Sequence, residues 1–438
     1  MVIKLIKQGY EQTELGILPK DWNVDYFEEH LDVFAGVGFK KSEYTEQGIK
    51  LLRIDNVSYG KITWESIAYL PKKYLETYPK LVLEEGDVLV ALNRPITNGK
   101  LKIAILQKND VPSILYQRVG KIVFTDQNYD RKFLFYVLQK YIKKFVEETS
   151  VGTDQPFIST VKLKKLQLPI PKNPKEQTVI AEFLSDTDEL MKQLDYLIEK
   201  KKNIKQGVMQ ELLTGKKRLH GFEKKQGTKQ SELGLIPENW DVVELGNYAF
   251  ITKLAGFEYT LHFNSYKDGG DVIVIRGTNI THNKLDLSDV RTIPQTTSNK
   301  LPRSQLSKDD LVFAYVGTIG PVYLVESNNL YHLGPNTCKI HVEGKIVPKF
   351  LLVYFTSWLL SNEIVKQTSV GAQPSLSMSK IRKFLIILPP TKEEQSAIVQ
   401  ILSDMDAEIE ELEKNKEKYI MIKNGMMQKL LTGEIRLQ

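Results

Sequence analysis

The segments that come nearest to catalytic motifs in this chain are all incomplete. Residues 34–38 read Phe-Ala-Gly-Val-Gly, the Phe-x-Gly-x-Gly form of a loop that binds S-adenosylmethionine, but a glycine-permitted turn is the simpler explanation. The chain lacks the Asp/Asn-Pro-Pro-Tyr/Phe motif with which an adenine methyltransferase holds its base. Residues 343–345 read Glu-Gly-Lys without the preceding Pro-Asp of a nuclease site, and no Gly-x-x-x-x-Gly-Lys-Ser/Thr loop is present to bind ATP. We therefore expect no catalytic residue and no cofactor bound by this chain.

Metal and redox chemistry are not indicated either. Cys338 is the only cysteine, which excludes an internal disulfide or a cysteine-based zinc cluster and is typical of a reducing cytosol. The six histidines show no ligand spacing, so no metal site is expected. No run reaches the roughly 18 apolar residues of a membrane-spanning helix, and we expect a cytoplasmic protein with no membrane contact. The net charge of +6 permits nucleic-acid binding without arguing for it.

The elements that must position any site are organised as an internal repeat. Residues 176–219 return as residues 394–437, with a constant shift of 218 that is given, for example, by 431 minus 213 for two equivalent leucines. The same shift relates two Glu-Leu-Gly-x-x-Pro-x-x-Trp segments, at 14–22 and 232–240. A Gln-Pro loop at 152–156 returns at 371–374 with one residue deleted. Because the halves differ between these segments, the sequence predicts a fixed scaffold that carries two divergent domains.

Each repeat ends in a long helix with clear boundary signals. Asn173 is placed to cap the first helix, and Thr391 with Glu394 forms a capping box for the second. Gly215 and Gly433 stop the helices as left-handed caps. Each helix then has about 40 residues and a length of about 60 Å, so it needs a partner along its length.

Heptad spacing of apolar residues predicts that these two helices pair with each other as a coiled coil. A long core helix lying against a sheet is the alternative, and the heavily charged remaining faces disfavour it. Because the connection between the repeats is short and polar, we expect an antiparallel pair with a pseudo-two-fold axis and one domain at either end. The residues expected to pair the helices are Leu184, Met191, Leu194, Ile198, Leu402, Ile409, Leu412 and Ile422.

The divergent segments read as mixed α/β domains, so the predicted fold is α+β: two such domains held apart by two long antiparallel helices. Short β-type runs are expected at 51–54, 87–91, 103–106, 272–275 and 310–315, and one amphipathic helix per domain at 131–148 and 348–367. The expected divisions are an N-terminal segment at 1–19, a first variable domain at 20–172, a first helical region at 173–219, a linker and repeat start at 220–237, a second variable domain at 238–390 and a second helical region at 391–438.

Together these features resemble the specificity subunit of a type I restriction–modification system. The resemblance rests on the Glu-Leu-Gly-x-x-Pro-x-x-Trp opening of each half, the Gln-Pro loop, and the long helix that begins near Glu-Gln and ends in Leu-Leu-Thr-Gly. It covers essentially the whole chain. It implies that each variable domain is a target-recognition domain that reads one half of an asymmetric bipartite DNA site, while the helices set the spacer and dock methyltransferase subunits.

The resemblance also implies partners and cofactors. The chain would bind double-stranded DNA, two methyltransferase subunits and, for cleavage, restriction subunits. S-adenosylmethionine, ATP and Mg²⁺ would be used by those partner subunits, so adenine methylation and ATP-dependent cleavage would belong to the complex. The chain itself would be non-catalytic.

Candidates for base reading follow from hydrogen-bonding geometry, because Arg suits guanine and Asn or Gln suits adenine in the major groove. An Arg-x-x-Asn pattern at 53–56 returns at 276–279 with a changed middle. For the two loop glutamines, holding their own loop or contacting the DNA backbone is the alternative role. The candidates are Arg53, Asn56, Asn93, Arg94, Gln117, Arg118 and Gln155 in the first half, and Arg276, Thr278, Asn279, Asn336 and Gln373 in the second.

Two other interpretations are compatible with these residues. The first is a coiled-coil adaptor with two protein-binding domains and no DNA readout, which the supply of Arg, Asn and Gln in the variable domains disfavours. The second is an enzyme with an unrecognised active site. Incubation of the purified chain with DNA, S-adenosylmethionine and Mg²⁺ would reveal such an enzyme through product formation.

Overall fold

The chain divides into two compact units in the computed structural model. Unit 1 consists of residues 1–195 and 415–438, and unit 2 consists of residues 196–414. Two helices contribute to both units: α5 (Pro174–Leu213) and α11 (Lys392–Leu430). The structure describes residues 6–126, 129–149, 156–223, 227–263, 269–281, 283–368 and 374–437.

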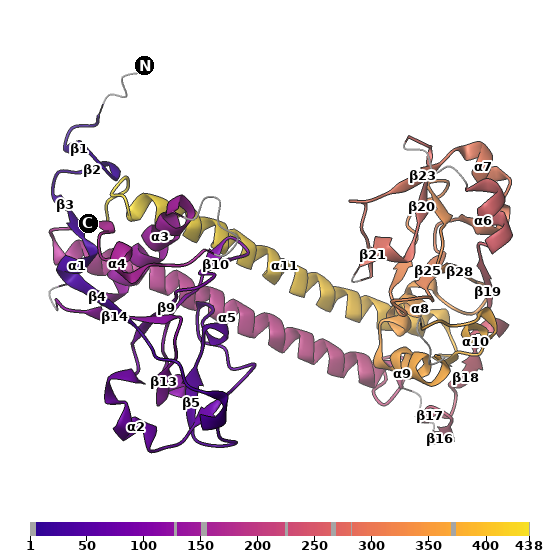
Figure 1. The fold of residues 1–438 in the computed structure, drawn as a ribbon. Helices are drawn as coiled ribbons and strands as arrows, with labels where there is room; N and C mark the ends of the chain where they lie inside the picture. The colour runs from indigo at the N-terminus through magenta and orange to yellow at the C-terminus, as the bar shows by residue number, and fades with distance from the viewer. Residues whose placement is uncertain are drawn as a thin grey trace. The chain divides into compact units, whose positions relative to one another are not determined.

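Unit 1 contains two principal β-sheets (Figure 1). The larger sheet has the strand order β4 (Leu31–Ala35), β14 (Val119–Phe124), β9 (Val88–Ala91), β12 (Ile103–Ile105) and β6 (Tyr59–Gly60). The smaller sheet has the order β7 (Tyr69–Leu70), β5 (Ile49–Leu52), β13 (Ser113–Leu115) and β8 (Val82–Leu83).

The larger sheet of unit 1 is covered on both faces. Val88 and Val90 of β9 belong to a core cluster shared with α3 (Arg131–Thr149), whereas Leu89 belongs to the cluster between the two sheets. Because successive side chains of a strand point to opposite faces, α3, the larger sheet and the smaller sheet form three layers. A strand buried on both faces has an uninterrupted apolar run, as β9 has.

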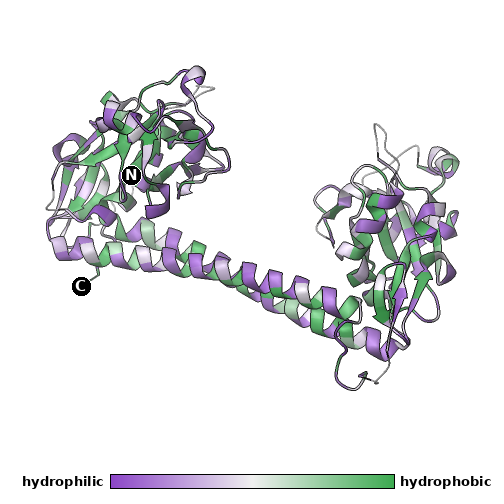
Figure 2. Cartoon of the chain, turned by 90° about the horizontal axis from the view of Figure 1, so that it is seen from below, coloured by the Kyte–Doolittle hydropathy of each residue, from purple (hydrophilic) through white to green (hydrophobic). Residues whose placement is uncertain are grey.

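Unit 2 repeats this architecture. One sheet has the order β19 (Ala249–Lys253), β28 (Thr337–Val342), β25 (Leu311–Ala314) and β26 (Val322–Leu324), and the other has the order β23 (Arg291–Ile293), β20 (Val272–Ile275), β27 (Tyr331–Leu333) and β24 (Gln305–Leu306). Leu311 and Phe313 pack in the cluster that contains α8 (Pro348–Phe355), and Val312 packs between the sheets. In both units the sheet strands carry hydrophobic residues (Figure 2).

Smaller elements complete each unit. The antiparallel two-stranded pairs are β1 (Tyr10–Thr13) with β2 (Gly16–Pro19), β3 (Trp22–Tyr26) with β15 (Gln167–Pro171), β10 (Ile96–Thr97) with β11 (Lys100–Leu101), β16 (Thr228–Ser231) with β17 (Gly234–Pro237), β18 (Asp241–Glu244) with β29 (Leu385–Leu388), and β21 (Ile280–Thr281) with β22 (Lys284–Leu285). The short helices are α1 (Phe27–His30), α2 (Tyr74–Thr77), α4 (Thr160–Leu163), α6 (Gly256–His262), α7 (Gln295–Asn299) and α10 (Met378–Arg382).

The predicted amphipathic helix of the second domain is wrong in one respect. The prediction placed a single helix at 348–367, whereas the structure has α8 followed by a separate helix, α9 (Trp358–Gln367). Thr356 and Ser357 interrupt the helix because their hydroxyls donate to the carbonyls of Val353 and Tyr354, at 2.8 and 2.6 Å. Such local side-chain bonds compete with helical ones. The corresponding prediction for the first domain, at 131–148, is confirmed by α3.

The boundary signals of the long helices are confirmed with one correction. The Asn173 side chain accepts from the Lys175 N–H at 3.0 Å, and the Thr391 hydroxyl accepts from the Glu394 N–H at 3.2 Å. Gly215 and Gly433 follow the helices with φ of +68° and +65°. Glu394, however, does not close a capping box, because its carboxylate is bound to an arginine described below.

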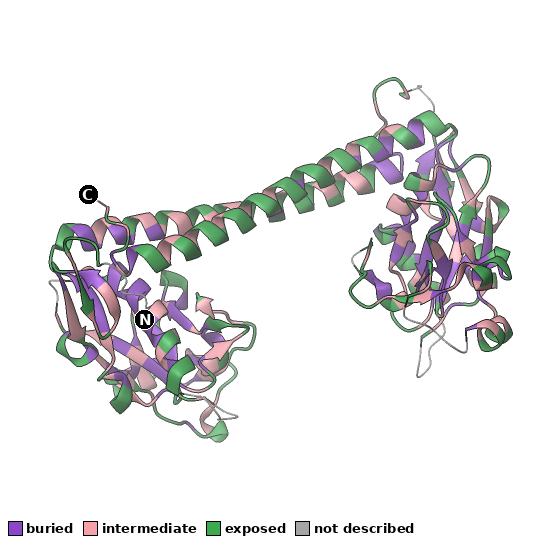
Figure 3. Ribbon diagram, turned by 90° about the horizontal axis from the view of Figure 1, so that it is seen from above, coloured by how far each residue is buried: buried purple, intermediate pink, exposed green. Residues whose placement is uncertain are grey.

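Within each unit, α5 and α11 lie side by side and run antiparallel (Figure 1). In unit 1, Asp188 pairs with Lys423 and Asp195 pairs with Lys416, so one residue number falls as the other rises. In unit 2 the same inverse order separates Lys205, which pairs with Asp406, from Lys201 and Lys202, which pair with the later residues Glu408 and Glu413. The outward residues of both helices are exposed (Figure 3). The α+β class and the two long helices are thus confirmed.

Among the described residues, no helix is both long enough and apolar enough to cross a lipid bilayer.

Candidate nucleic-acid interface

The Arg-x-x-Asn candidates form a loop clip in each unit. In unit 1, Asn56 is 1% exposed, accepts from the Arg53 N–H at 3.0 Å, and donates to the carbonyls of Thr63 and Ser66 at 2.9 and 3.1 Å. The Arg53 guanidinium donates to the hydroxyl of Ser66 at 2.8 Å. These four residues close the chain segment that follows β5.

Unit 2 builds the same clip. Asn279 is 4% exposed, accepts from the Arg276 N–H at 3.2 Å, and donates to the carbonyls of Asp286 and Asp289 at 3.2 and 2.8 Å. The Arg276 guanidinium donates to the Asp289 carboxylate at 3.1 Å. The bonds fall seven and ten residues after the asparagine in both units.

The clip corrects part of the predicted base-reading set. The amides of Asn56 and Asn279 are buried and already bonded within their own loops, so neither presents an amide edge to a base. Arg53 and Arg276 are half-buried and hold the same loops. Sequence reasoning took the survival of polar residues at both ends of this pattern as a sign of recognition. The structure gives loop closure as its physical cause.

A second pair of candidates occupies one equivalent turn. Arg118 lies between β13 and β14, and Asn336 lies between β27 and β28, 218 positions later in the chain. Both are exposed and both have left-handed backbone, with φ of +68° and +66°. The Arg118 carbonyl accepts from the Leu92 N–H at 2.9 Å, and the Asn336 carbonyl accepts from the Tyr315 N–H at 3.0 Å. The backbone is therefore the same and only the presented side chain differs.

The segment after β9 lies beside this turn. Asn93 forms an isolated antiparallel bridge with Phe157, and the Arg94 N–H donates to the Pro156 carbonyl at 2.9 Å. In unit 2 the Gly317 N–H donates to the Pro374 carbonyl at 3.1 Å, which makes Gly317 the counterpart of Arg94. Arg94 has φ of +45° and Gly317 has φ of +74°, so the first unit places a charged side chain where the second has glycine.

We call these neighbouring segments the strand-end surface: residues 93–95 and 116–118 in unit 1, and residues 316–318 and 334–336 in unit 2. In unit 1 this surface contains three exposed polar residues, Arg94, Gln117 and Arg118. Neither arginine has a side-chain ion pair among the described residues. Two free guanidinium groups beside an amide can donate hydrogen bonds to phosphate oxygens or to base edges.

The surface is joined to the clip through the backbone. The Tyr116 N–H donates to the Leu52 carbonyl at 3.1 Å, and the Gly334 N–H donates to the Ile275 carbonyl at 2.8 Å. Thr278 is exposed in the clip of unit 2.

The Gly-rich segment at 34–38 packs against the turn, because a Cβ on Gly36 would lie 2.5 Å from the Leu115 carbonyl. This close packing explains why residue 36 is glycine, and it agrees with the interpretation of residues 34–38 as a glycine-permitted turn.

Two of the predicted DNA-binding residues cannot be placed, and one exposed aromatic residue was not predicted. Gln155 and Gln373 lie outside the described residues, and Pro156 and Pro374 are the first described residues after them. Sequence reasoning missed Phe157, which is 61% exposed directly beside Asn93. An exposed aromatic ring at a strand-end surface can stack on a base or a sugar. Its position next to the Gln-Pro pair that recurs in both halves was the available signal.

The helix-pairing candidates fall into three groups. Leu184, Ile198, Leu402 and Ile409 are buried, and Met191, Leu194 and Leu412 are half-buried. Ile422 is 42% exposed, so its predicted burial between the helices is wrong. Leu184 packs with Leu430 and Leu431 in unit 1, and Leu402 packs with Leu212 and Leu213 in unit 2.

Each unit also contains a joint in which the end of one repeat closes on the start of the other. In unit 1 the Arg436 guanidinium donates to Glu176 and to Asp21, with nitrogen–oxygen distances of 2.7 Å to each carboxylate. A Cβ on Gly433 would lie 2.4 Å from Pro19, so only glycine lets the helix end meet this proline. The Trp22 indole donates to Glu176 at 3.3 Å.

The joint of unit 2 has the same parts at the same shift. Arg218 donates to both oxygens of Glu394, at 2.6 and 2.9 Å, and to the Asn239 side-chain oxygen at 3.1 Å. A Cβ on Gly215 would lie 2.5 Å from Pro237. The guanidinium also lies over the Trp240 ring, 5.3 Å from its centroid. Sequence reasoning missed both arginines, although each follows the terminal glycine of its repeat by three residues.

Comparison with known proteins agrees with this geometry. The family model described as "Type I restriction modification DNA specificity domain" matches residues 19–200 and again residues 237–420. The chain is 43% identical over 226 residues to the type I restriction enzyme MjaVIII specificity subunit of Methanocaldococcus jannaschii, an alignment that spans 50% of this chain and 53% of that protein. It is 28% identical over 441 residues to the putative MjaX specificity subunit of the same organism, spanning 99% of this chain and 98% of that protein.

The fold is shared with a solved structure. The S subunit of a type I restriction–modification system from M. genitalium superimposes with a TM-score of 0.52 at 16% identity, covering 93% of this chain and 96% of that chain. The two tandem matches, one on each unit's scaffold of sheets and paired helix segments, show that the chain belongs to the family of type I restriction–modification DNA specificity domains.

Proposed function

We propose that the chain is the DNA sequence-specificity subunit of a type I restriction–modification complex. Each variable domain reads one half of an asymmetric, bipartite target. The observation that carries this proposal is the equivalent turn, where an identical backbone presents Arg118 in one unit and Asn336 in the other. Arg pairs best with guanine and Asn with adenine, so one scaffold would read two different half-sites.

The helices α5 and α11 have a second role in this proposal. They pair as an antiparallel coiled coil, set the spacer between the half-sites and dock two methyltransferase subunits. The inverse order of the ion pairs within each unit, such as Asp195 with Lys416 in unit 1 and Lys205 with Asp406 in unit 2, supports such pairing. A target read by two domains of one chain need not be palindromic, because the domains need not be identical.

The chemistry of the complex would then lie in its partners. The chain acts in the cytoplasm without a catalytic residue or cofactor of its own. The methyltransferase subunits use S-adenosylmethionine, and the restriction subunits use ATP and Mg²⁺. The domain boundaries at 20–172 and 238–390 define the pieces that would exchange as recognition modules.

An exchange of residues 20–172 for those of a relative tests the function. The hybrid is expressed with the methyltransferase subunits, and methylated sites are mapped by sequencing. We expect one half-site to change and the other half-site and the spacer to stay. A change in both halves contradicts modular reading. If the purified chain with its partners shifts no duplex in a mobility assay, the adaptor interpretation replaces DNA reading.

The pairing of the helices has its own test. Leu194 and Leu412 are half-buried on α5 and α11, and Leu194→Asp combined with Leu412→Asp places a charge on each. We expect loss of methyltransferase binding in size-exclusion chromatography, with the matched control Gln193→Asp plus Glu411→Asp at exposed neighbouring positions remaining assembled. Intact assembly of the leucine double variant would contradict docking that depends on the helix pair.

A further inference from the structure

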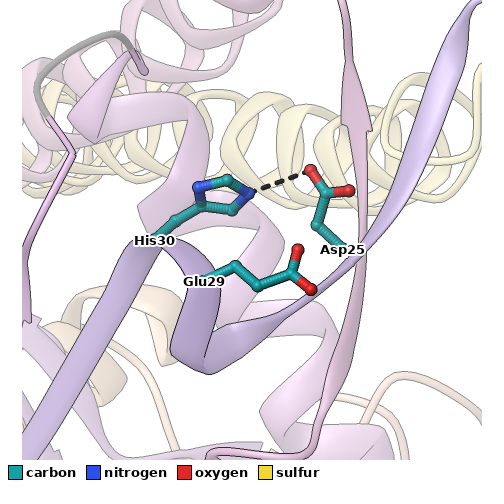
Figure 4. A group of neighbouring side chains, drawn as sticks. All are labelled: Asp25, Glu29 and His30. Atoms are coloured by element: carbon teal, nitrogen blue, oxygen red, sulfur yellow. Dashed lines mark hydrogen bonds and ion pairs between the residues drawn. The ribbon is translucent and has the colours of Figure 1, made fainter.

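Three potential metal ligands converge at the start of unit 1. Asp25 lies near the end of β3, and Glu29 and His30 lie in α1 (Figure 4). One ligand atom from each lies within 4.8 Å of the other two. The His30 Nε2 atom is 2.9 Å from the Asp25 carboxylate. This contact is a hydrogen bond, which a bound ion would replace: tetrahedral Zn–N and Zn–O bonds of about 2.0–2.2 Å need the two atoms about 3.4 Å apart, a shift of about 0.5 Å.

The opposite side of the imidazole has the surroundings of a metal-binding histidine. Nδ1 is buried, has no hydrogen-bond partner, and lies 3.8 Å from the Asp126 carboxylate. His30 as a whole is 9% exposed, and its ring packs on Tyr129 with centroids 4.3 Å apart. A ligating histidine usually directs its other N–H at a carboxylate, which fixes the ring and the tautomer. Asp126 lies on that side of the ring, and at 3.8 Å it would have to approach to accept this hydrogen bond.

The cluster concentrates negative charge. Asp25, Glu29 and Asp126 all lie near His30. Among the described residues, no Lys or Arg forms an ion pair with Asp25 or Glu29. A cation bound by Asp25, Glu29 and His30 would balance the negative charge of these carboxylates.

Unit 2 shows that the fold itself does not require this cluster. The Thr125 N–H donates to the His30 carbonyl at 3.0 Å, and the Glu343 N–H donates to the Tyr248 carbonyl at 2.9 Å, so the two positions are equivalent. At the shift of 218, Val243, Asn247 and Tyr248 stand in place of Asp25, Glu29 and His30. The same strand and turn therefore form without any of the three ligands.

We propose that Asp25, Glu29 and His30 bind a divalent first-row transition-metal ion, of which Zn²⁺ is the representative, with Asp126 orienting the imidazole. One imidazole nitrogen and two carboxylates are a ligand set that such ions accept. The ion would fasten β3 to α1 and stabilise unit 1 alone. The expectation of no metal site came from histidine spacing, whereas this cluster depends on the turn from β3 into α1.

The test is zinc binding to the full-length chain after treatment with a chelator. Isothermal titration with ZnCl₂ should show one tight equivalent, and Co²⁺ should give the visible absorption of a protein-ligated ion. His30→Gln should abolish both signals, and the control His220→Gln, at an exposed histidine, should retain them. Absence of stoichiometric binding, or equal binding by His30→Gln, overturns the proposal.

Two further variants keep the test decisive if His30→Gln does not fold. Glu29 is exposed, so Glu29→Gln removes a ligand without opening a cavity, and circular dichroism would report its folding. Asp126→Asn removes the orienting carboxylate and should weaken zinc binding about 10- to 100-fold. Unchanged affinity of the folded Glu29→Gln protein would overturn the site.

Discussion

The two units use the same joint but present different side chains at the same turn. At the joint, Arg436 binds Glu176 in unit 1 and Arg218 binds Glu394 in unit 2, with matching glycines and prolines beside them. At the turn, the backbone is preserved while Arg118 is replaced by Asn336. The comparison separates residues that hold the scaffold from residues free to change what it recognises.

The joints themselves are not quite identical, and their differences are electrostatic. Arg436 has a second carboxylate partner in Asp21, whereas Arg218 has the neutral side chain of Asn239. Glu176 also accepts from the Trp22 indole, whereas the Trp240 indole nitrogen is buried without a partner. Each carboxylate is nearly inaccessible, with side-chain exposures of 5% for Glu176 and 2% for Glu394. The unit 2 joint therefore depends more completely on its single arginine.

The largest expected effect comes from removing that arginine. Arg218→Met leaves the buried Glu394 carboxylate uncompensated, and breaking a buried ion pair in this way costs about 3–5 kcal/mol. Arg436→Met should cost less, because Glu176 keeps the Trp22 indole and Asp21 is left in water. Hydrogen–deuterium exchange should show faster exchange at the ends of α5 and at the start of α11 within unit 2.

Lys216→Met is the matched control, since Lys216 is exposed two residues away. It should leave exchange unchanged. An Arg436→Met protein that loses as much protection in unit 1 as Arg218→Met loses in unit 2 would contradict the asymmetry between the joints.

The clips should give the next largest effect. Asn56→Ala leaves the Thr63 carbonyl without its side-chain donor and the Ser66 carbonyl with the Arg53 guanidinium alone, which should lower stability by about 1–3 kcal/mol. Asn279→Ala should have an effect of the same size in unit 2. Denaturant unfolding monitored with exchange protection in each unit would measure both. The exposed neighbour Asp55→Ala is the control, and a smaller loss for Asn56→Ala than for this control would exclude the clip as a stabilising feature.

Substitution at the equivalent turn should change recognition instead of stability. Arg118→Asn gives unit 1 the side chain of unit 2 on a backbone that already accepts it. We expect the protein to lose its preference for guanine at one position of the first half-site. The free-energy difference between guanine and the other bases there should change by about 1–3 kcal/mol. Binding to a library of duplexes, with the methyltransferase subunits present, would measure this. A uniform loss across all sequences would instead identify Arg118 as a phosphate contact.

The smallest expected effect concerns acid stability at the unit 1 joint. The hydrogen bonds and charge of Arg436 hold the pKa of Asp21 below its ordinary value. A depressed pKa means that Asp21 stabilises the fold above its ordinary pKa and that this contribution is lost as pH falls through the lower one. Because Asp21 is largely exposed, the contribution is at most about 1 kcal/mol. Asp21→Asn, which copies Asn239, should flatten the pH dependence of the urea midpoint below about pH 4. Equal slopes would contradict the assignment.

Periodic and repeated features were predictable from the sequence. The ends of α5 and α11 follow from cap residues and terminal glycines, and β9 and β25 follow from short apolar runs between turns. These signals are local, so a single chain segment contains all the necessary information. The break between α8 and α9 was missed because apolar periodicity continues through Thr356 and Ser357 while their hydroxyls end the helix.

The candidate site was only partly predictable, for the opposite reason. Arg118 and Asn336 could be chosen by residue type, but their equivalence depends on a turn that connects strands of two different sheets, which sequence alone does not reveal. Residue type alone also placed Asn56 and Asn279 among base readers, because it does not reveal whether an amide is already bonded. The partners Arg436 and Glu176 are 260 residues apart, and only the repeat shift relates them to Arg218 and Glu394.

The equal spacing of the two clips has an evolutionary consequence. In both units the asparagine amide donates to the carbonyls seven and ten residues downstream. Residues 56–66 and 279–289 are therefore loops of the same length, closed by the same hydrogen bonds. Recombination within the gene could exchange these two loops, because a loop of equal length would rejoin the flanking polypeptide without insertion or deletion. Each half of the duplicated chain thus contains a loop of the length and closure that the other half could accept.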